Sequence, residues 1–173
     1  MKIGLSLSAW FQREAPLHPG ESPWTVVCDD GFFAVVWIPR SAAASGNVTV
    51  VVGNGAVDVV LIHWNQPARL LAAVAQYGRQ GVPVRLTVVD NASEPGAVAQ
   101  LRDELPLVEG DFDRPPLLLE QDANLGWGPG ANVGLRRWLA DPDGSEWCGV
   151  APHDALAADG TLARLVEEGV RRP

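Results

Sequence analysis

Positively charged side chains are scarce in this sequence of 173 residues. Its 13 Lys and Arg residues stand against 21 Asp and Glu residues, which gives a formal net charge of -8 and a pI near 4.7. Nucleic-acid affinity rests on clustered Lys and Arg that neutralise phosphates and release counterions. We therefore expect no nucleic-acid partner.

Long apolar runs and paired cysteines are also lacking. No stretch reaches the roughly 18 unbroken apolar residues that a membrane-spanning helix needs. The opening MKIGLSLSAWF is short, is interrupted by two Ser and lacks a small-residue cleavage site, which argues against a signal peptide. Cys28 and Cys148 lie far apart without metal-site spacing, so we expect two small buried hydrophobes in a reducing compartment. The expected location is the cytoplasm.

The composition changes near residue 55. Residues 1–55 carry scattered Pro and Gly without a sustained period, and we expect an irregular leader that need not belong to the native domain. Within it, GFFAVVWI (31–38) and NVTVVV (47–52) are typical of strands, and the following GNG predicts a hairpin.

From residue 57 onward the pattern becomes regular. VDVVLIHW reads as a buried β-branched strand, and Pro67 fits the first turn of a helix. Strands that alternate with helices imply parallel pairing and an α/β fold. The expected strands are 57–64, 84–90 and 116–121, and the expected helices are 67–80, 95–105, 129–140 and 159–170.

Four polar segments follow the ends of strands: HWNQP, DNASEPG, DANLGWGPGAN and APHDA. Each one alone is typical of a turn or a helix cap. In parallel sheets, however, ligands bind where strands end and helices begin. Four such segments at one edge of a sheet therefore predict a ligand site.

The glycine-rich segment also matches another motif. Gly126, Gly128 and Ala131 satisfy the loose G-x-G-x-x-G/A pattern of a dinucleotide-binding turn. That turn follows the first strand of its unit directly, whereas this one follows the third strand and is separated from it by DAN. The context therefore disfavours a nicotinamide enzyme.

VDVVLIHWN, LTVVDNASEPG, NLGWGPGANVGLRR and HDALAADGTLARLVEE occur in this order over residues 57–172. Together they resemble the nucleotide-binding half of a family 2 glycosyltransferase, in the group related to rhamnosyltransferases. The resemblance implies a GT-A or Rossmann-like α/β sandwich with a mostly parallel sheet, truncated at the C-terminus, with residues 56–173 as its nucleotide-sugar-binding part. It also implies inverting transfer from a nucleotide-diphosphate sugar in cell-surface glycan or glycoconjugate synthesis.

The resemblance assigns nucleotide contacts to the first two segments. Asp90 would hold the base and ribose, and Asn91 with the following turn would shape the same pocket. The chemistry agrees, because a carboxylate accepts hydrogen bonds from a ribose hydroxyl and Trp64 offers a stacking face, with packing as its alternative role. Asn65 would close the strand turn and face the nucleotide, whereas His63 is expected to be a packed histidine.

The third segment supplies Gly128 and Asn132 by the same resemblance, as parts of a glycine-rich turn that approaches the donor. Many relatives have an Arg just before that Asn. Here the position is Ala131, so phosphate neutralisation would fall on a metal ion and a helix N-terminus.

The fourth segment matches a reduced D-x-D motif. Asp154 corresponds to the last Asp of this motif and would bind Mg²⁺ or Mn²⁺. Its alternative role is that of a turn or cap residue. The position of the first Asp is occupied by Pro152. His153 is either a substitute ligand or, as we favour, a neighbour.

The resemblance places the catalytic general base beyond Pro173, together with the part that binds a glycan or lipid-linked acceptor. The catalytic residue therefore stays unknown, and this chain is interpreted as a fragment. Peripheral membrane association of a full-length protein is compatible with this interpretation. The alternative is a non-catalytic nucleotide-binding remnant or regulatory module.

The leader hypothesis is testable by limited proteolysis. We expect a protease to remove residues 1–47 before it cleaves within 57–140, because a segment outside the domain has no folding free energy of its own to protect it. Equal resistance of the two regions would contradict the hypothesis.

Overall fold

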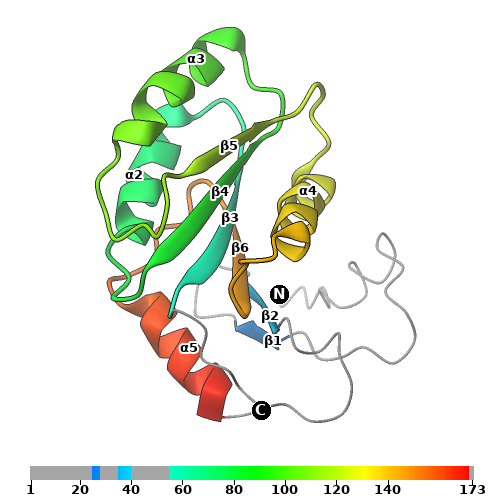
Figure 1. Cartoon of the computed structure of the whole chain (residues 1–173). Coiled ribbons are helices and arrows are strands. Elements are labelled where there is room, and N and C mark those ends of the chain that lie inside the picture. Colours follow the sequence, from blue (N-terminus) through cyan, green and yellow to red (C-terminus); the bar gives the residue numbers. More distant parts are fainter. Residues whose placement is uncertain (1–24, 28–34, 40–54, 172–173) are drawn as a thin grey trace, which may run out of the picture.

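The computed structural model of the chain describes residues 25–27, 35–39 and 55–171 (Figure 1). Strands and helices alternate through most of this part. The strands are β1 (Thr25–Val27), β2 (Val35–Pro39), β3 (Val57–His63), β4 (Val84–Asp90), β5 (Leu117–Glu120) and β6 (Trp147–Pro152). The helices are α2 (Pro67–Tyr77), α3 (Pro95–Glu104), the short 3₁₀ helix η2 (Leu105–Leu107), α4 (Trp127–Ala140) and α5 (Thr161–Arg171).

The strands form one six-stranded sheet in the order β1-β2-β6-β3-β4-β5. β3 pairs in parallel with β4 on one side and with β6 on the other, and β5 extends the parallel part beyond β4. β2 joins β6 in antiparallel fashion, and β1 pairs with β2. The predicted α/β fold with a mostly parallel sheet is confirmed.

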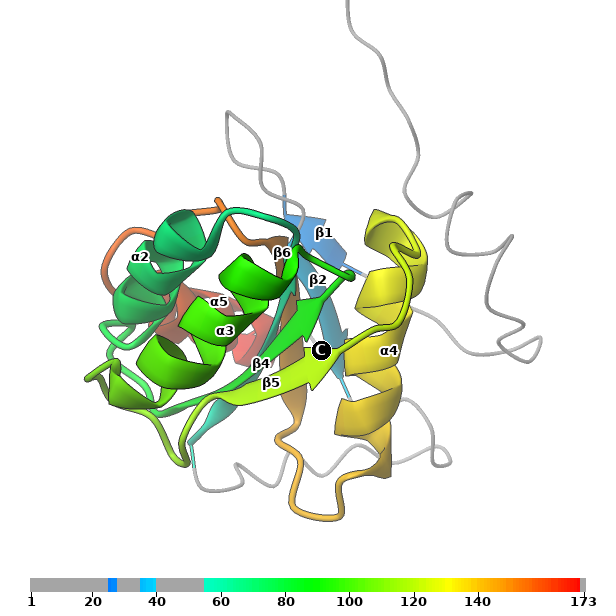
Figure 2. The ribbon, with the colours of Figure 1, turned by 90° about the horizontal axis from the view of Figure 1, so that it is seen from above.

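Helices cover both faces of the sheet (Figure 2). α2, α3 and α5 lie on one face, where Leu70, Leu101 and Leu162 belong to one hydrophobic core. α4 lies on the other face, where Leu135 and Trp138 pack with residues of β3 and β6. All seven residues of β3 and of β4 are buried, which explains why their sequences are nearly continuous apolar runs.

The chain changes faces next to β3. It leaves β3 toward α2 on one face, and it enters β6 from α4 on the opposite face. The carboxyl ends of β3 and β6 therefore flank a topological switch point, which is where open α/β sheets bind ligands.

The expected elements agree with the structure except at some boundaries. α2 ends at Tyr77 instead of residue 80, because the next residue, Gly78, lies against the backbone of Gly110. α4 begins at Trp127, two residues before Pro129, where the helix was expected to start. Proline is tolerated in a first turn, so it does not mark the exact start. β6 was not among the strands whose bounds were predicted, and its six residues include both Gly149 and Pro152.

Two strands come from the stretch that was expected to be an irregular leader. β2 lies partly within the predicted strand 31–38, and its Ile38 and Pro39 pair with Cys148 and Trp147 of β6. The predicted strand 47–52 and its hairpin lie outside the described residues, as does Cys28. Whether residues 1–55 belong to the native domain stays a prediction.

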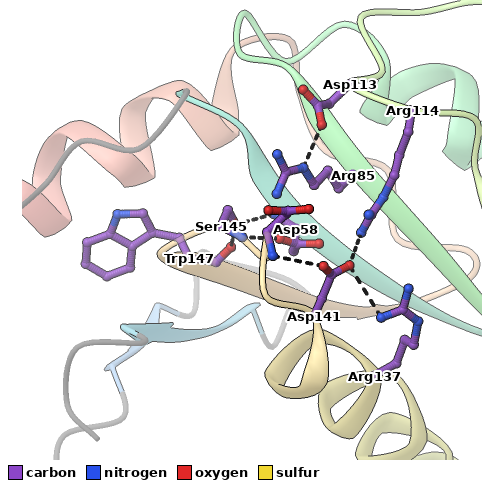
Figure 3. A network of polar contacts seen from close by, with 9 residues as sticks. Asp58, Arg85, Asp113, Arg114, Arg137, Asp141, Ser145 and Trp147 are labelled. Atoms are coloured by element: carbon purple, nitrogen blue, oxygen red, sulfur yellow. Dashed lines mark hydrogen bonds and ion pairs between the residues drawn. The ribbon is translucent and has the colours of Figure 1, made fainter. Parts of the chain in front are cut away.

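A polar network closes the amino-terminal edge of the parallel sheet (Figure 3). Asp58 of β3 is buried, and its carboxylate accepts a 2.7 Å hydrogen bond from the backbone N–H of Ser145. The Asp58 N–H donates in return to the Ser145 hydroxyl oxygen at 2.9 Å. This reciprocal pair fixes the loop that leads into β6.

Asp141 anchors the same edge from the end of α4 (Figure 3). Arg114 donates to its carboxylate at 2.7 Å and Arg137 at 3.3 Å. The hydrogen bond from Arg114 holds the pKa of Asp141 below its ordinary value. Because Asp58 and Asp141 are both satisfied within the protein, these two buried carboxylates serve the fold.

The close contact between α4 and β3 depends on Gly134, where an added Cβ would overlap the Val60 side chain. We expect Gly134→Ala to lower the free energy of unfolding by about 1–3 kcal/mol, because overpacking forces the helix away from the sheet. Gly96→Ala in α3 is the matched control, since its Cβ would meet nothing within 4 Å. The control should be neutral or stabilising by up to about 1 kcal/mol. Equal denaturant midpoints for both variants would contradict the packing argument.

Candidate functional site

The carboxyl edge of the sheet brings the sequence-predicted site residues together only in part. Trp64 and Asn65 follow β3, Asp90 and Asn91 stand at the end of β4, and Asp154 follows β6. Gly128 is buried in the first turn of α4, and Asn132 is half-buried one turn further along. Hydrogen bonds link the loop after β3 directly to the loop after β4.

A buried pair stands at the end of the two central strands. His63 and Asp90 are opposite each other in the β3–β4 register, and they are 0% and 1% exposed. The His63 Nδ1 and Asp90 Oδ1 atoms are 2.7 Å apart. His63 is thus a packed histidine, as expected, but Asp90 is its partner and not an open carboxylate at the surface.

Ser93 supplies the other contacts of Asp90. Its backbone N–H donates to Asp90 Oδ2 at 3.0 Å, and its hydroxyl donates to Asp90 Oδ1. Burial alone would raise the pKa of Asp90, but the hydrogen bonds from His63 and Ser93 outweigh burial and lower that pKa below its ordinary value. Asp90 is therefore a carboxylate whose negative charge is stabilised within the protein.

The contacts of His63 define its tautomer. The backbone N–H of Gln66, the residue before α2, donates to His63 Nε2 at 3.0 Å. A ring nitrogen that accepts a hydrogen bond carries no proton, so the proton of the neutral ring lies on Nδ1 and points at Asp90. His63 therefore connects the start of α2 to the end of β4.

The loops after β3 and β4 interlock through two further hydrogen bonds. The Asn65 N–H donates to the Ser93 hydroxyl oxygen at 2.9 Å, and the Glu94 N–H donates to Asn65 Oδ1 at 2.7 Å. Asn65 adopts a positive φ of 53°, a conformation that Asn tolerates better than most residues. The neighbouring Trp64 is 51% exposed, so the interlocked loops present a large aromatic ring to solvent.

Asn91 links the loop after β4 to α4. Its side-chain NH₂ donates to the Gly126 carbonyl at 2.9 Å, and its side chain lies so close to Gly130 that a Cβ there would stand 3.0–3.1 Å from the amide. Its Oδ1 atom is buried and finds no hydrogen-bond partner among the described residues. This oxygen is an acceptor at the site with capacity for a donor.

The glycine-rich segment is mostly helical. Only Gly126, just before α4, has a positive φ, at 81°. Gly130 and Gly134 face the sheet instead and allow α4 to approach β3 and the end of β4. The N-terminus of α4, which carries partial positive charge, nevertheless lies at the carboxyl edge.

Asp154 lies exposed in the turn after β6, beside His153. The His153 Nδ1 atom is 3.2 Å from the Ile62 carbonyl, its Nε2 is buried without a partner among the described residues, and its ring centroid lies 5.2 Å from that of His63. Burial first, and then the neighbouring His63, lower the pKa of His153. This favours the neutral ring at physiological pH.

The residues around Asp154 fit a divalent cation only if the ligand supplies part of the coordination. Within the described ranges, no group of three or more His, Cys, Asp or Glu side chains is arranged to hold a metal ion. One exposed carboxylate does fit Mg²⁺ or Mn²⁺ when most of the other ligands are diphosphate oxygens and water. The sequence expectation for Asp154 therefore remains a hypothesis.

Sequence reasoning missed Ser93 and the hydrogen bonds of His63. A signal for Ser93 was present, because an Asp side chain that accepts from a backbone N–H a few residues later is a common turn arrangement. The His63–Asp90 contact had no such signal. It depends on the register between β3 and β4, which spans 27 positions of sequence.

Comparison with solved structures supports the fold. Residues 1–349 of S. aureus TarS match with a TM-score of 0.50 and 16% identity, over 64% of this chain and 31% of that chain. The mannosyltransferase PcManGT from Pyrobaculum calidifontis, in complex with GDP-Man and Mn²⁺, matches with a TM-score of 0.48 and 21% identity, over 85% of this chain and 35% of that chain.

The chain spans about a third of the length of these two structures. No protein-family model and no curated protein matches the sequence. Among the described residues, no helix combines the length and apolar character required to cross a membrane.

The buried Asp90 predicts a pH-dependent contribution to stability. Because its pKa is lowered in the folded state, the stabilisation is complete well above the ordinary value of 3.8 and is lost as the pH falls through the folded pKa. We expect Asp90→Asn to lower the free energy of unfolding by about 1–3 kcal/mol at pH 7, because hydrogen bonds to a buried charge are lost. Denaturant titrations should show the difference from wild type shrinking below about pH 4. A difference that does not vary with pH would contradict this assignment.

Proposed function

We propose that the carboxyl edge binds a nucleotide-diphosphate sugar, and that the chain is the donor-binding part of an inverting glycosyltransferase of family 2, in the rhamnosyltransferase-like group. The observation that carries the proposal is the pair of interlocked loops after β3 and β4, which presents an exposed Trp64 beside the switch point. The order of the four sequence segments supports it independently.

The nucleotide would lie over the loops after β3 and β4. Trp64 offers a stacking face for the base, and Asn65 offers an amide group for hydrogen bonds. Asn91 is 3% exposed and its Oδ1 atom is buried, so this residue would shape the pocket and would not contact the ligand itself. Asp90 serves the same site from beneath, as a buried carboxylate held by His63 and Ser93.

The diphosphate would lie between α4 and the turn after β6. Gly128 is in the first turn of α4, where the helix dipole favours negative charge, and Asn132 is on the following turn. Asp154 would hold Mg²⁺ or Mn²⁺ against the phosphates, since Ala131 brings no positive charge. The cation would supply charge neutralisation for the departing diphosphate.

In this proposal the described residues bind and orient the donor, and an acceptor hydroxyl attacks the anomeric carbon from the side opposite the diphosphate. Inversion requires a general base that takes the proton of that hydroxyl. We assign this role to no described residue. The acceptor class that fits the resemblance is a glycan or a lipid-linked sugar.

Calorimetry with nucleoside diphosphates tests the proposal. We expect uridine, thymidine or guanosine diphosphate to bind more tightly with Mn²⁺ or Mg²⁺ than with a chelator, because the phosphates need a compensating charge. Asp154→Asn should abolish the difference between the metal and chelator conditions.

Asp103→Asn is the control for this experiment, because it removes the same charge from an exposed position on α3. It should retain the metal dependence. Metal-independent binding that ignores Asp154→Asn would overturn the metal assignment, and the absence of binding to any nucleoside diphosphate would overturn the function.

A further inference from the structure

His63 lies at the centre of the interlocked loops, although neither the sequence pattern nor the proposed chemistry gives it a function. Its ring is 0% exposed, so it cannot contact a ligand. Its two nitrogens nevertheless contact two segments of the proposed site: Nδ1 faces Asp90 at the end of β4, and Nε2 accepts from Gln66 at the start of α2.

These two contacts enclose the residues that face the ligand. Trp64 and Asn65 lie between His63 and Gln66 in the chain, so the ring spans the base of the loop that carries them. Asn65 is in turn tied to Ser93, whose hydroxyl donates to Asp90. The conformation of the Trp64 loop thus depends on a chain of hydrogen bonds through His63, Asp90 and Ser93, which the backbone between Asn65 and Gln66 closes into a ring.

We infer that His63 is a positioning residue of the donor site, held as the neutral Nδ1–H tautomer between Asp90 and the Gln66 N–H, and that Asp90 acts on the nucleotide through this ring. The inference rests on the proposed function, because it needs a ligand over Trp64 and Asn65. In this inference Asp90 does not contact the nucleotide but holds His63 in place, in agreement with the 1% exposure of Asp90.

The tautomer can be measured without a ligand. In long-range ¹H–¹⁵N spectra of the full chain, we expect His63 Nδ1 to have the shift of a protonated ring nitrogen and Nε2 that of an unprotonated one. Asp90→Asn should reduce this preference, because an amide stabilises the Nδ1–H tautomer less than a carboxylate does. A ring protonated on Nε2 in the wild type would overturn the inference.

Two substitutions each preserve one half of the ring's contacts. His63→Asn keeps a donor near the Nδ1 position, and His63→Gln keeps an acceptor near the Nε2 position. We expect each variant to lose about tenfold in nucleoside diphosphate affinity, the effect of about one lost hydrogen bond, and His63→Leu to lose more. Amide exchange at Asn65 and Gln66 should accelerate in the same order.

A double-mutant cycle separates support from direct contact. If Asp90 acts through the ring, His63→Gln combined with Asp90→Asn should cost little more affinity than one change alone. If Asp90 contacts the nucleotide itself, the two losses should add. Additive losses, or full affinity in His63→Gln, would overturn the inference.

Gln80→Leu is the matched control for lost stability. Gln80 is another fully buried polar side chain, and its amide links the end of α2 to the start of α5, far from the site in the fold. This variant should be less stable yet keep wild-type affinity below its melting temperature. If it lost affinity as the His63 variants do, a positioning role for His63 would be contradicted. A wild-type chain that binds no nucleoside diphosphate would instead refute the proposed function.

Discussion

The burial of β3 on both faces is the constraint on which the rest of the structure depends. A strand enclosed by two neighbours and two helix layers leaves no water for the polar groups near its ends. β3 nevertheless carries Asp58 near its start and His63 at its end, both buried. Each must form its hydrogen bonds within the protein. The partners that Asp58 and His63 use differ, and so do the two edges of the sheet.

At the amino-terminal edge the buried carboxylates are satisfied by nearby residues of the same edge. Asp58 is satisfied by Ser145, and the nearby Asp141 is satisfied by Arg114 and Arg137. At the carboxyl edge the hydrogen bonds involve a loop, because the partners of His63 are Asp90 at the end of β4 and Gln66 in the loop that carries Trp64 and Asn65. The same physical requirement therefore stabilises the fold at one edge and orders the loops of the proposed site at the other.

The predictability of each part follows from the range of the interactions that determine it. β3, β4, α3 and the parallel topology were predictable, since buried β-branched runs and prolines at helix starts are local features. The bounds of β6 were not predicted, because its six residues include Gly149 and Pro152 and lack a long β-branched run. The burial of Asp90 was not predictable, because its partner His63 is fixed only by the pairing of two distant segments.

The helix over 129–140 was predicted, but the separate roles of its glycines were not, for a related reason. Glycine serves both for turns and for close packing, and a sequence alone does not separate the two uses. Here Gly126 forms the turn, whereas Gly134 permits the contact with Val60. Only the position of α4 over β3 distinguishes them.

Two buried acceptors in the described part of the chain lack hydrogen-bond partners, and both lie at the carboxyl edge: Asn91 Oδ1 and His153 Nε2. Such atoms cost free energy in a folded protein, so native structures contain few of them. They lie beside the ends of β4 and β6, on either side of β3. Both atoms are buried, so within the described part of the chain the carboxyl edge is where polar side chains are not all satisfied by the protein itself.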